Sequence, residues 1–258
     1  MCRSVRRLGL LAFAFAAACA LPRSSANADG PEADGVSEFH FARLAFGAYG
    51  RPFGTSRGEP WLRDWPEADF HFLQGLRRLS RIDSAPGSSR QVLLTSDELF
   101  DYPVVYAVKA GFMRLDDNEA ARMREYLLRG GFLIVDDFHG PTEWAEFAAS
   151  MHRVFPERSI VDLPEDDEVF HVLYDLDQRT QIPGRQAVAR GVTWEHPQGV
   201  PAHWRGIYDD DGRLMVAINF NMDLGDAWEH ADDPFYPEPL TALAYRFGIN
   251  YVVYAMTH

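Results

Sequence analysis

Short apolar runs recur along the first half of the chain and contain few polar residues. They cover residues 39–46, 91–94, 102–108 and 132–135. A run without alternating polar residues is typical of a strand that is buried on both faces, as the strands of a parallel sheet are. The four runs are therefore predicted to be strands of one sheet.

Two helices are predicted between these runs. The first spans residues 67–80, where the apolar residues at helical spacing are Phe70, Leu73, Leu76 and Leu79. The second begins after Asp116, where Glu119 completes a capping box, and ends at the glycine pair 130–131. The resulting order of strand, helix, strand, strand, helix, strand predicts an α/β fold with a mostly parallel central sheet.

The second half of the chain is predicted to add a helix and a β-hairpin. The helix begins near Thr142 and ends before Pro156. The hairpin joins residues 206–208 to residues 214–220 through a turn rich in aspartate and glycine. This C-terminal β-hairpin region follows the parallel part of the sheet along the chain.

The last residues are predicted as two separate pieces. Residues 239–247 form a short helix that Gly248 caps, because glycine often follows the last helical residue. Residues 249–256 then form a separate buried element. Further upstream, His171 lies among apolar residues and is predicted as a core histidine with satisfied hydrogen bonds, whereas residues 178–198 are predicted to be irregular.

The beginning of the sequence has the three parts of a secretory signal peptide. Basic residues precede an apolar stretch at 8–20, and small residues at 26–28 fit a cleavage site. The sequence therefore predicts a signal peptide that ends at residue 28, a short linker at 29–38 and a single domain at 39–258. Such a protein is exported, and it is periplasmic or secreted.

Both cysteines, Cys2 and Cys19, lie in the predicted signal peptide. A processed chain would therefore have no disulfide, no thiolate nucleophile and no cysteine metal site. A second interpretation stays open, in which Cys19 carries a lipid that anchors the protein to a membrane. Against it, Ala16 stands where a bacterial lipobox usually has leucine.

The charge of the chain limits its partners. The sequence has 38 acidic and 25 basic residues, for a formal net charge of −13. The electrostatic field of a protein with this negative charge repels nucleic acid and anionic membrane surfaces. No nucleic-acid partner is expected, and a membrane is expected only through the lipid anchor.

Residues with candidate chemistry follow two of the predicted strands. Ligand sites in open α/β sheets lie beyond the carboxyl ends of the strands, so the turns after residues 132–135 and 214–220 are expected to meet at one pocket. Its candidate binding residues are Asp136, Asp137, His139, Asn221, Asp223, Asp226 and Trp228. No H-E-x-x-H spacing is present, and no cofactor is predicted.

A G-x-S-x-G pattern occurs at residues 54–58. In hydrolases the serine of this pattern stands between an apolar strand and a helix, and the strained turn exposes its hydroxyl. Here no apolar strand precedes it directly, and Pro60 follows it. The pattern therefore does not favour a serine hydrolase.

Several short motifs occur in the order found in the bacterial domain of unknown function 4159. They lie at residues 39–46, 126–137, 151–156, 170–174, 226–228 and 248–255. The chain resembles that family from about residue 39 to residue 256. The resemblance implies a flavodoxin-like three-layer sandwich similar to class I glutamine amidotransferases, in exported or membrane-associated bacterial proteins.

The resemblance does not extend to glutaminase catalysis. That chemistry requires a cysteine thiolate at a strand-to-helix elbow, activated by histidine. Asp136 stands at a corresponding strand end, and a processed chain has no cysteine. The nucleophile is missing.

Three functions stay open from the sequence. The favoured one is a non-catalytic module that uses the strand-end pocket to bind a small ligand or an envelope protein partner. One alternative is a metal-assisted hydrolase that uses the Asp and His side chains at the strand ends, including His230. The other is a structural or assembly protein of the cell envelope. The first two depend on the two turns meeting at one place.

Overall fold

The computed structural model describes residues 37–47, 59–84 and 89–258. The predicted signal peptide, Cys19, most of the linker and the pattern at 54–58 lie outside these residues, so the interpretations that depend on them stay predictions. Within the described residues, none of the helices combines the length and apolar character that crossing a bilayer requires.

The described residues form a seven-stranded sheet with the order β2-β1-β3-β4-β7-β6-β5. The first five strands in this order are parallel, β6 is antiparallel to β7, and β5 is antiparallel to β6. The prediction of a mostly parallel sheet is confirmed. The strands are β1 (Ala42–Ala45), β2 (Arg90–Leu93), β3 (Val104–Val108), β4 (Phe132–Asp136), β5 (Val161–Asp162), β6 (His203–Tyr208) and β7 (Leu214–Phe220).

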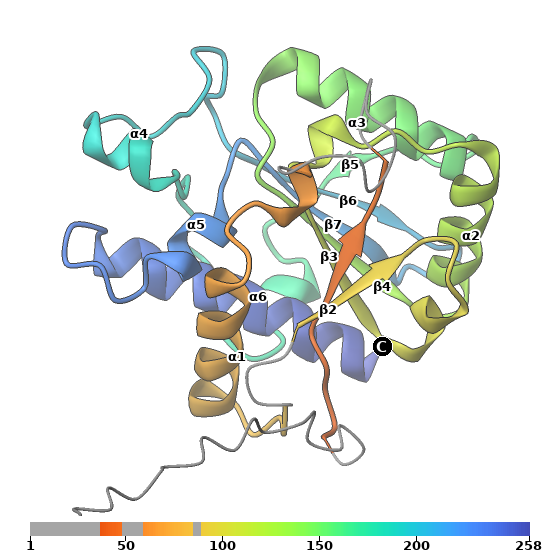
Figure 1. Cartoon of the computed structure of the whole chain (residues 1–258), viewed down its shortest axis with the longest axis horizontal. Coiled ribbons are helices and arrows are strands. Elements are labelled where there is room, and N and C mark those ends of the chain that lie inside the picture. Colours follow the sequence, from red (N-terminus) through yellow and green to blue (C-terminus); the bar gives the residue numbers. More distant parts are fainter. Residues whose placement is uncertain (1–36, 48–58, 85–88) are drawn as a thin grey trace, which may run out of the picture. The chain divides into compact units, whose positions relative to one another are not determined.

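Helices cover both faces of this sheet (Figure 1). One face packs against α2 and α3, and the other packs against α1, α5 and α6. The helices are α1 (Glu67–Leu79), α2 (Asp117–Leu128), α3 (Gly140–Val154), α4 (Arg185–Ala189), α5 (Leu224–Glu229) and α6 (Glu238–Thr257). The result is the predicted α/β sandwich of three layers.

Strand β4 explains why the apolar runs show no polar alternation. Leu133 and Val135 point to the core shared with α2 and α3, whereas Phe132 and Ile134 point to the core shared with α1 and α6. All four side chains are fully buried. Since successive side chains of a strand point to opposite faces, a strand covered on both faces needs apolar residues at every position.

Two local predictions are confirmed in detail. The side chain of Asp116 accepts a hydrogen bond from the amide of Glu119 at 2.8 Å, and the Glu119 carboxylate accepts one from the amide of Asp116 at 2.9 Å. This capping box begins α2. The predicted hairpin is formed by β6 and β7, although it is part of the central sheet and not an addition to it.

The predicted end of the last helix at Gly248 is wrong. Helix α6 continues through this glycine to Thr257, so residues 249–256 are not a separate element. A Cβ atom on Gly248 would lie 2.5 Å from the ring of Phe72 and 2.8 Å from the ring of Trp228. The glycine therefore allows three elements to pack closely, and it does not end the helix.

The predicted buried face of α1 is partly wrong. Phe70 is 46% exposed and Leu79 is 50% exposed, whereas Phe72 is fully buried. Residues that are three apart in a helix turn by about 300° per step, so Phe70 and Leu79 point in opposite directions. The core face instead uses Ala68, Phe72, Leu73 and Leu76.

Two predictions about the middle of the chain are also wrong. His171 is not a core histidine: its side chain is partly exposed and lies 3.1 Å from the carboxylate of Asp175. Residues 178–198 are not wholly irregular, because they include the short helix α4.

Candidate functional site

The turns that follow β4 and β7 meet at the carboxyl end of the sheet. A side-chain oxygen of Asp136 accepts hydrogen bonds from the amides of Leu224 at 2.8 Å and Gly225 at 3.1 Å, which are the first residues of α5. The same oxygen accepts a bond from the hydroxyl of Tyr106 at 2.8 Å. The amide of Asp137 also donates to the carbonyl of Met222. The expected convergence of the two turns is therefore present.

Asp136 joins the two turns and does not face solvent. Its side chain is fully buried. Burial, followed by the neighbouring Asp137, raises the pKa of Asp136 to about 7. Because its bonded oxygen already caps α5, Asp136 has a structural role at the base of the site.

Unusual backbone conformations gather at this edge of the sheet. Among the described residues, four that are not glycine have positive φ angles: Asp64 (60°), Lys109 (54°), Asp137 (53°) and Asn221 (63°). The last three directly follow β3, β4 and β7. Positive φ is uncommon outside glycine and clusters at functional sites, where the surrounding structure holds the strained conformation. All four residues lie at the strand-end site.

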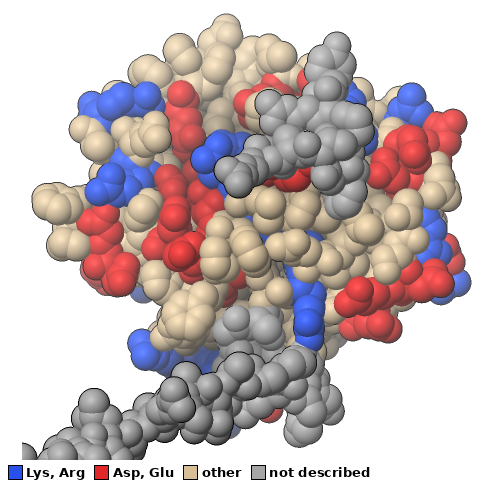
Figure 2. Space-filling model, viewed as in Figure 1, with Lys and Arg blue, Asp and Glu red and all other residues tan. Residues whose placement is uncertain are grey.

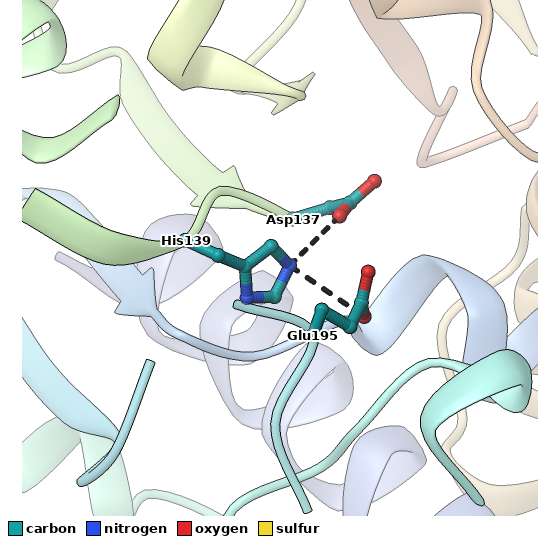
Figure 3. Close-up of side chains that lie close together, drawn as sticks. All are labelled: Asp137, His139 and Glu195. Carbon is teal, nitrogen blue, oxygen red and sulfur yellow. Dashed lines mark hydrogen bonds and ion pairs between the residues drawn. The ribbon is translucent and has the colours of Figure 1, made fainter. Parts of the chain in front are cut away.

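Asp137 lies in a charged network, part of which Figure 3 shows, with His139 between Asp137 and Glu195. Its Oδ1 atom lies 2.5 Å from Nζ of Lys109 and 3.1 Å from Nε2 of His139. The same His139 nitrogen lies 3.5 Å from a carboxylate oxygen of Glu195. Burial opposes ionisation of Asp137, but Lys109 and His139 outweigh it and hold its pKa below the ordinary value. Asp137 is therefore an ionised carboxylate inside the protein.

Asp137 favours the charged forms of both cations in this network. Burial lowers the pKa of Lys109, but the attraction of Asp137 outweighs it and raises that pKa above the ordinary value. The pKa of His139 is raised in the same way, because its bond to Asp137 outweighs burial. The pair of Lys109 and Asp137 neutralises one carboxylate of the site.

Two further carboxylates lie beside Asp137 and form no ion pair with the described residues. One oxygen each of Asp64, Asp137 and Asp223 lie within 4.8 Å of one another. We call these three side chains the carboxylate cluster. Burial, then Asp137, raises the pKa of Asp64 to about 9, and the same two causes raise the pKa of Asp223 well above its ordinary value. Oδ2 of Asp64 is buried without a hydrogen-bond partner.

The carboxylate cluster adjoins a pocket of about 520 Å³. Figure 2 shows acidic side chains gathered in a band on this side of the molecule, with basic side chains beside it. The described residues that line this strand-end pocket include five acidic and four basic ones. They are Asp64, Glu195, Asp223, Asp226 and Glu229, with Arg63, Lys109, Arg185 and Arg190; Trp65, Gly184, Gln186 and His230 complete the lining.

The segment that begins α4 closes one side of the pocket. The amide of Gly184 donates to Glu195 at 2.9 Å, and the amide of Arg185 donates to Asp226 at 2.6 Å. A Cβ atom on Gly184 would lie 2.5 to 2.9 Å from oxygens of Glu195, Asp226 and Asp223. Glycine is therefore required here, because the backbone must approach three carboxylates closely.

Two other groups of side chains also have distances that suit a metal ion. Asp137, His139 and Glu195 form one group, whose ligand atoms lie within 4.8 Å of one another. Asp226 and Glu229 in α5 and His230 directly after it form the other. His230 and Asp226 are 3.5 Å apart.

The predicted pocket residues occupy three different positions. Asp223 and Asp226 line the strand-end pocket, and Asp223 also accepts from the amide of Asp226 as the N-cap of α5. Asp137 and His139 lie in the buried network beside it. Asn221 holds the turns together, because it accepts from the amide of Gly140 at 3.0 Å and donates to the carbonyl of Pro201 at 2.8 Å.

Trp228 does not line the strand-end pocket. It is fully buried, and its ring centroid lies 4.5 Å from that of Phe72 and 5.5 Å from that of Tyr106. These contacts place it in the core between the sheet and α1. The spacing of Trp228 in the chain could not distinguish a core residue from a ligand platform.

Sequence reasoning missed Asp64, Lys109 and Glu195. Lys109 had a usable signal, because it directly follows a predicted strand and is the one lysine in the sequence. Asp64 and Glu195 come from irregular segments that had no periodicity to place them. Their position depends on long-range contacts of the folded chain.

The model of a protein family described as "Domain of unknown function (DUF4159)" matches residues 40–256. The match spans the sheet, the helices up to the next-to-last residue of α6 and every residue of the strand-end site. No curated protein matches the chain.

Proposed function

This chain belongs to the DUF4159 family, and we propose that it is a binding module whose strand-end pocket holds a divalent cation. The cation binds at the inner end of the pocket, between Asp64 and Asp223 and against Asp137. With the predicted signal peptide, the module acts outside the cytoplasm.

The observation that carries this proposal is the geometry of the carboxylate cluster. Three loops that follow β1, β4 and β7 each bring one aspartate to within 4.8 Å of the other two. Lys109 pairs directly with Asp137, and its charge also reaches Asp223, as that of Arg43 reaches Asp64. Within the described residues, however, neither Asp64 nor Asp223 forms an ion pair. Placing such carboxylates together in a buried site is unfavourable unless a cation or a proton compensates for their charge.

The ligand atoms favour a hard cation. All three are carboxylate oxygens, which Mg²⁺ and Ca²⁺ prefer over the nitrogen and sulfur ligands that suit softer metals. The wide pocket beside the cluster also leaves space for water, and Mg²⁺ retains several waters when it binds to proteins. We therefore expect Mg²⁺ or Ca²⁺ to be the cation of this site.

A binding role agrees better with the elbow after β4 than a glutaminase role does. Asp137, and not Asp136 as the sequence suggested, has the positive φ angle of a strand-to-helix elbow, at the place where a nucleophile stands in elbow-type enzymes. Its carboxylate is buried and paired with Lys109, so it cannot attack an amide. Residues 137–140 contain neither cysteine nor serine.

Calorimetric titration and thermal unfolding test the proposal. After treatment with a chelator and its removal, the protein is titrated with Mg²⁺, Ca²⁺ and Zn²⁺. We expect saturable binding of Mg²⁺ or Ca²⁺ with one ion per chain. The ion should stabilise the folded protein by about 2.7 kcal/mol at about 100 times Kd, since it binds the folded state.

Two isosteric variants locate the ion. Asp64→Asn tolerates the positive φ angle, and Asp223→Asn keeps an N-cap side chain, so both should fold. Each should weaken cation binding about tenfold or more. Asp211→Asn in the exposed hairpin turn is the matched control and should bind as the natural sequence does. Unchanged affinity in both pocket variants would refute the proposed function.

A further inference from the structure

The rim of the strand-end pocket contains three consecutive residues, Arg63, Asp64 and Trp65, which we call the rim segment. A buried side chain of the core holds the backbone at this segment. The buried Arg43 donates to the carbonyls of Trp61 at 2.9 Å and Arg63 at 2.5 Å. The rim segment is therefore held in place before any ligand arrives.

Two arginines at the pocket are not engaged by acidic side chains. In the described part of the chain, Arg63 has no ion pair, and the guanidinium of Arg190 reaches only the carbonyl of Trp194, at 3.5 Å. By contrast, Arg185 pairs with Asp233 at 2.6 Å. Acidic residues outnumber basic ones in this chain. Both side chains are exposed at the pocket, so their guanidinium groups are free to bind an anionic group supplied by a ligand.

Trp65 adds an aromatic surface to the same rim. Its side chain is 40% exposed, and its indole nitrogen donates to the hydroxyl of Ser89 at 3.0 Å. The hydrogen bond holds the ring by its edge. An exposed indole that is fixed in this way is suited to stacking against a planar ring.

We infer that the pocket binds a phosphate ester with a planar ring, such as a nucleotide, as its complex with a divalent cation. This inference rests on the proposed function. The cation on the carboxylate cluster contacts the phosphate, Arg63 and Arg190 bind its remaining oxygens, and the ring packs on Trp65. The cation is essential, because five acidic residues would otherwise repel a phosphate.

The size and lining of the pocket agree with this class of ligand. A volume of about 520 Å³ is within the range of small-molecule sites. The lining combines acidic residues for a cation, basic residues for an anion and one exposed aromatic ring. A site for a bare metal ion needs only the first of these.

Calorimetric titration of the full chain at saturating Mg²⁺ tests the inference, with inorganic phosphate, AMP and adenosine as the probes. AMP should bind at least about tenfold more tightly than either phosphate or adenosine, because it alone offers both groups. Removing Mg²⁺ with a chelator should abolish AMP binding.

Variants of the rim separate the two contacts. Arg63→Gln should weaken AMP binding about tenfold without weakening the binding of Mg²⁺. Trp65→Leu should weaken AMP binding by a similar factor but leave the binding of phosphate unchanged. Arg77→Gln, at an exposed position near the end of α1, is the control and should have no effect.

The outcomes distinguish this inference from the proposed function. Binding of Mg²⁺ without any binding of phosphate or AMP would overturn the inference and leave the proposed function standing. Equal affinities for AMP and phosphate, or for AMP and adenosine, would also overturn it. Binding of AMP in the chelator, with no binding of Mg²⁺, would overturn both.

Discussion

At the scale of single residues, the strand-end site is built from backbone conformations that few side chains adopt. Each residue at positive φ costs about 1–3 kcal/mol unless its side chain tolerates that region, as Asp and Asn do better than most. Asp64, Asp137 and Asn221 fit this preference, and Lys109 does not. The ion pair between Lys109 and Asp137 is therefore the feature that keeps a lysine at this position.

Replacing Lys109 should change stability and cation binding in opposite directions. Lys109→Met leaves the buried Asp137 carboxylate without its partner, so the free energy of unfolding in a chelator should fall by about 3 kcal/mol. Cation affinity should rise, because the carboxylate cluster loses its internal counter-charge. Urea unfolding and calorimetry measure the two effects.

Lys109→Arg provides the comparison, because it keeps the charge. Lys109→Arg should lower the free energy of unfolding less than Lys109→Met does, and it should not raise the affinity for the cation. A Lys109→Met variant that is destabilised and binds the cation more weakly would show that Lys109 supports the binding geometry and does not compete with the ion.

At the scale of secondary-structure elements, close packing between helices determines which residues face the core and how far a helix continues. The core face of α1 and the course of α6 both depend on the contact at Gly248, where Phe72 and Trp228 come close to the α6 backbone. A helix that crosses its neighbours this closely needs a residue without a side chain.

Gly248→Ala should therefore destabilise the protein, although alanine favours helix formation by about 1 kcal/mol over glycine. The new methyl group would meet two buried rings, and such overpacking costs about 1–3 kcal/mol. The expected net result is a lower melting temperature by circular dichroism. A higher melting temperature would mean that the rings have space to move.

The sequence predicted helices and strands well where the residues that decide them are neighbours in the chain. The capping box at Asp116 and the uninterrupted run in β4 are examples, because each depends on neighbours in the chain or on burial of a whole strand. The errors at Phe70 and Gly248 have the opposite origin. The surroundings of these two residues depend on how α6 crosses α1, and the pattern of neighbouring residues does not predict this crossing.

The residues of the candidate site also divide into those that the sequence predicted and those that it did not. Asp136, Asp137, Asp223 and Asp226 were predictable, because the carboxyl ends of neighbouring parallel strands meet at one edge. Asp64 and Glu195 were not, because irregular segments bring them there. The roles within the site were also not predictable: Asp136 is a buried cap and Trp228 is a core residue.

At the scale of the whole molecule, the carboxylates of the site link stability to pH. Burial and the charges of Asp137, Asp226 and Glu229 raise the pKa of Asp64 from 3.8 to about 9, and Arg43 only partly opposes them. Between these two pH values the folded protein retains a proton that the unfolded chain has released. Raising the pH through this window therefore favours unfolding.

The metal-free protein should accordingly lose stability between about pH 4 and pH 9, compared with its Asp64→Asn variant. The difference in the free energy of unfolding, variant minus natural sequence, should increase with pH. Urea denaturation in a chelator at several pH values measures it. A difference that stays constant across the window would mean that Asp64 titrates as an ordinary exposed aspartate.

The position of β7 has a consequence for how the protein is made. This strand lies beside β4 in the sheet, yet 77 residues lie between Asp136 at the end of β4 and Leu214 at the start of β7, and α5 follows β7 closely. Domains begin to form while the ribosome is still extending them. The amides of Leu224 and Gly225 that bind Asp136 are synthesised long after it, so the nascent chain holds this carboxylate without these hydrogen-bond donors until α5 has emerged.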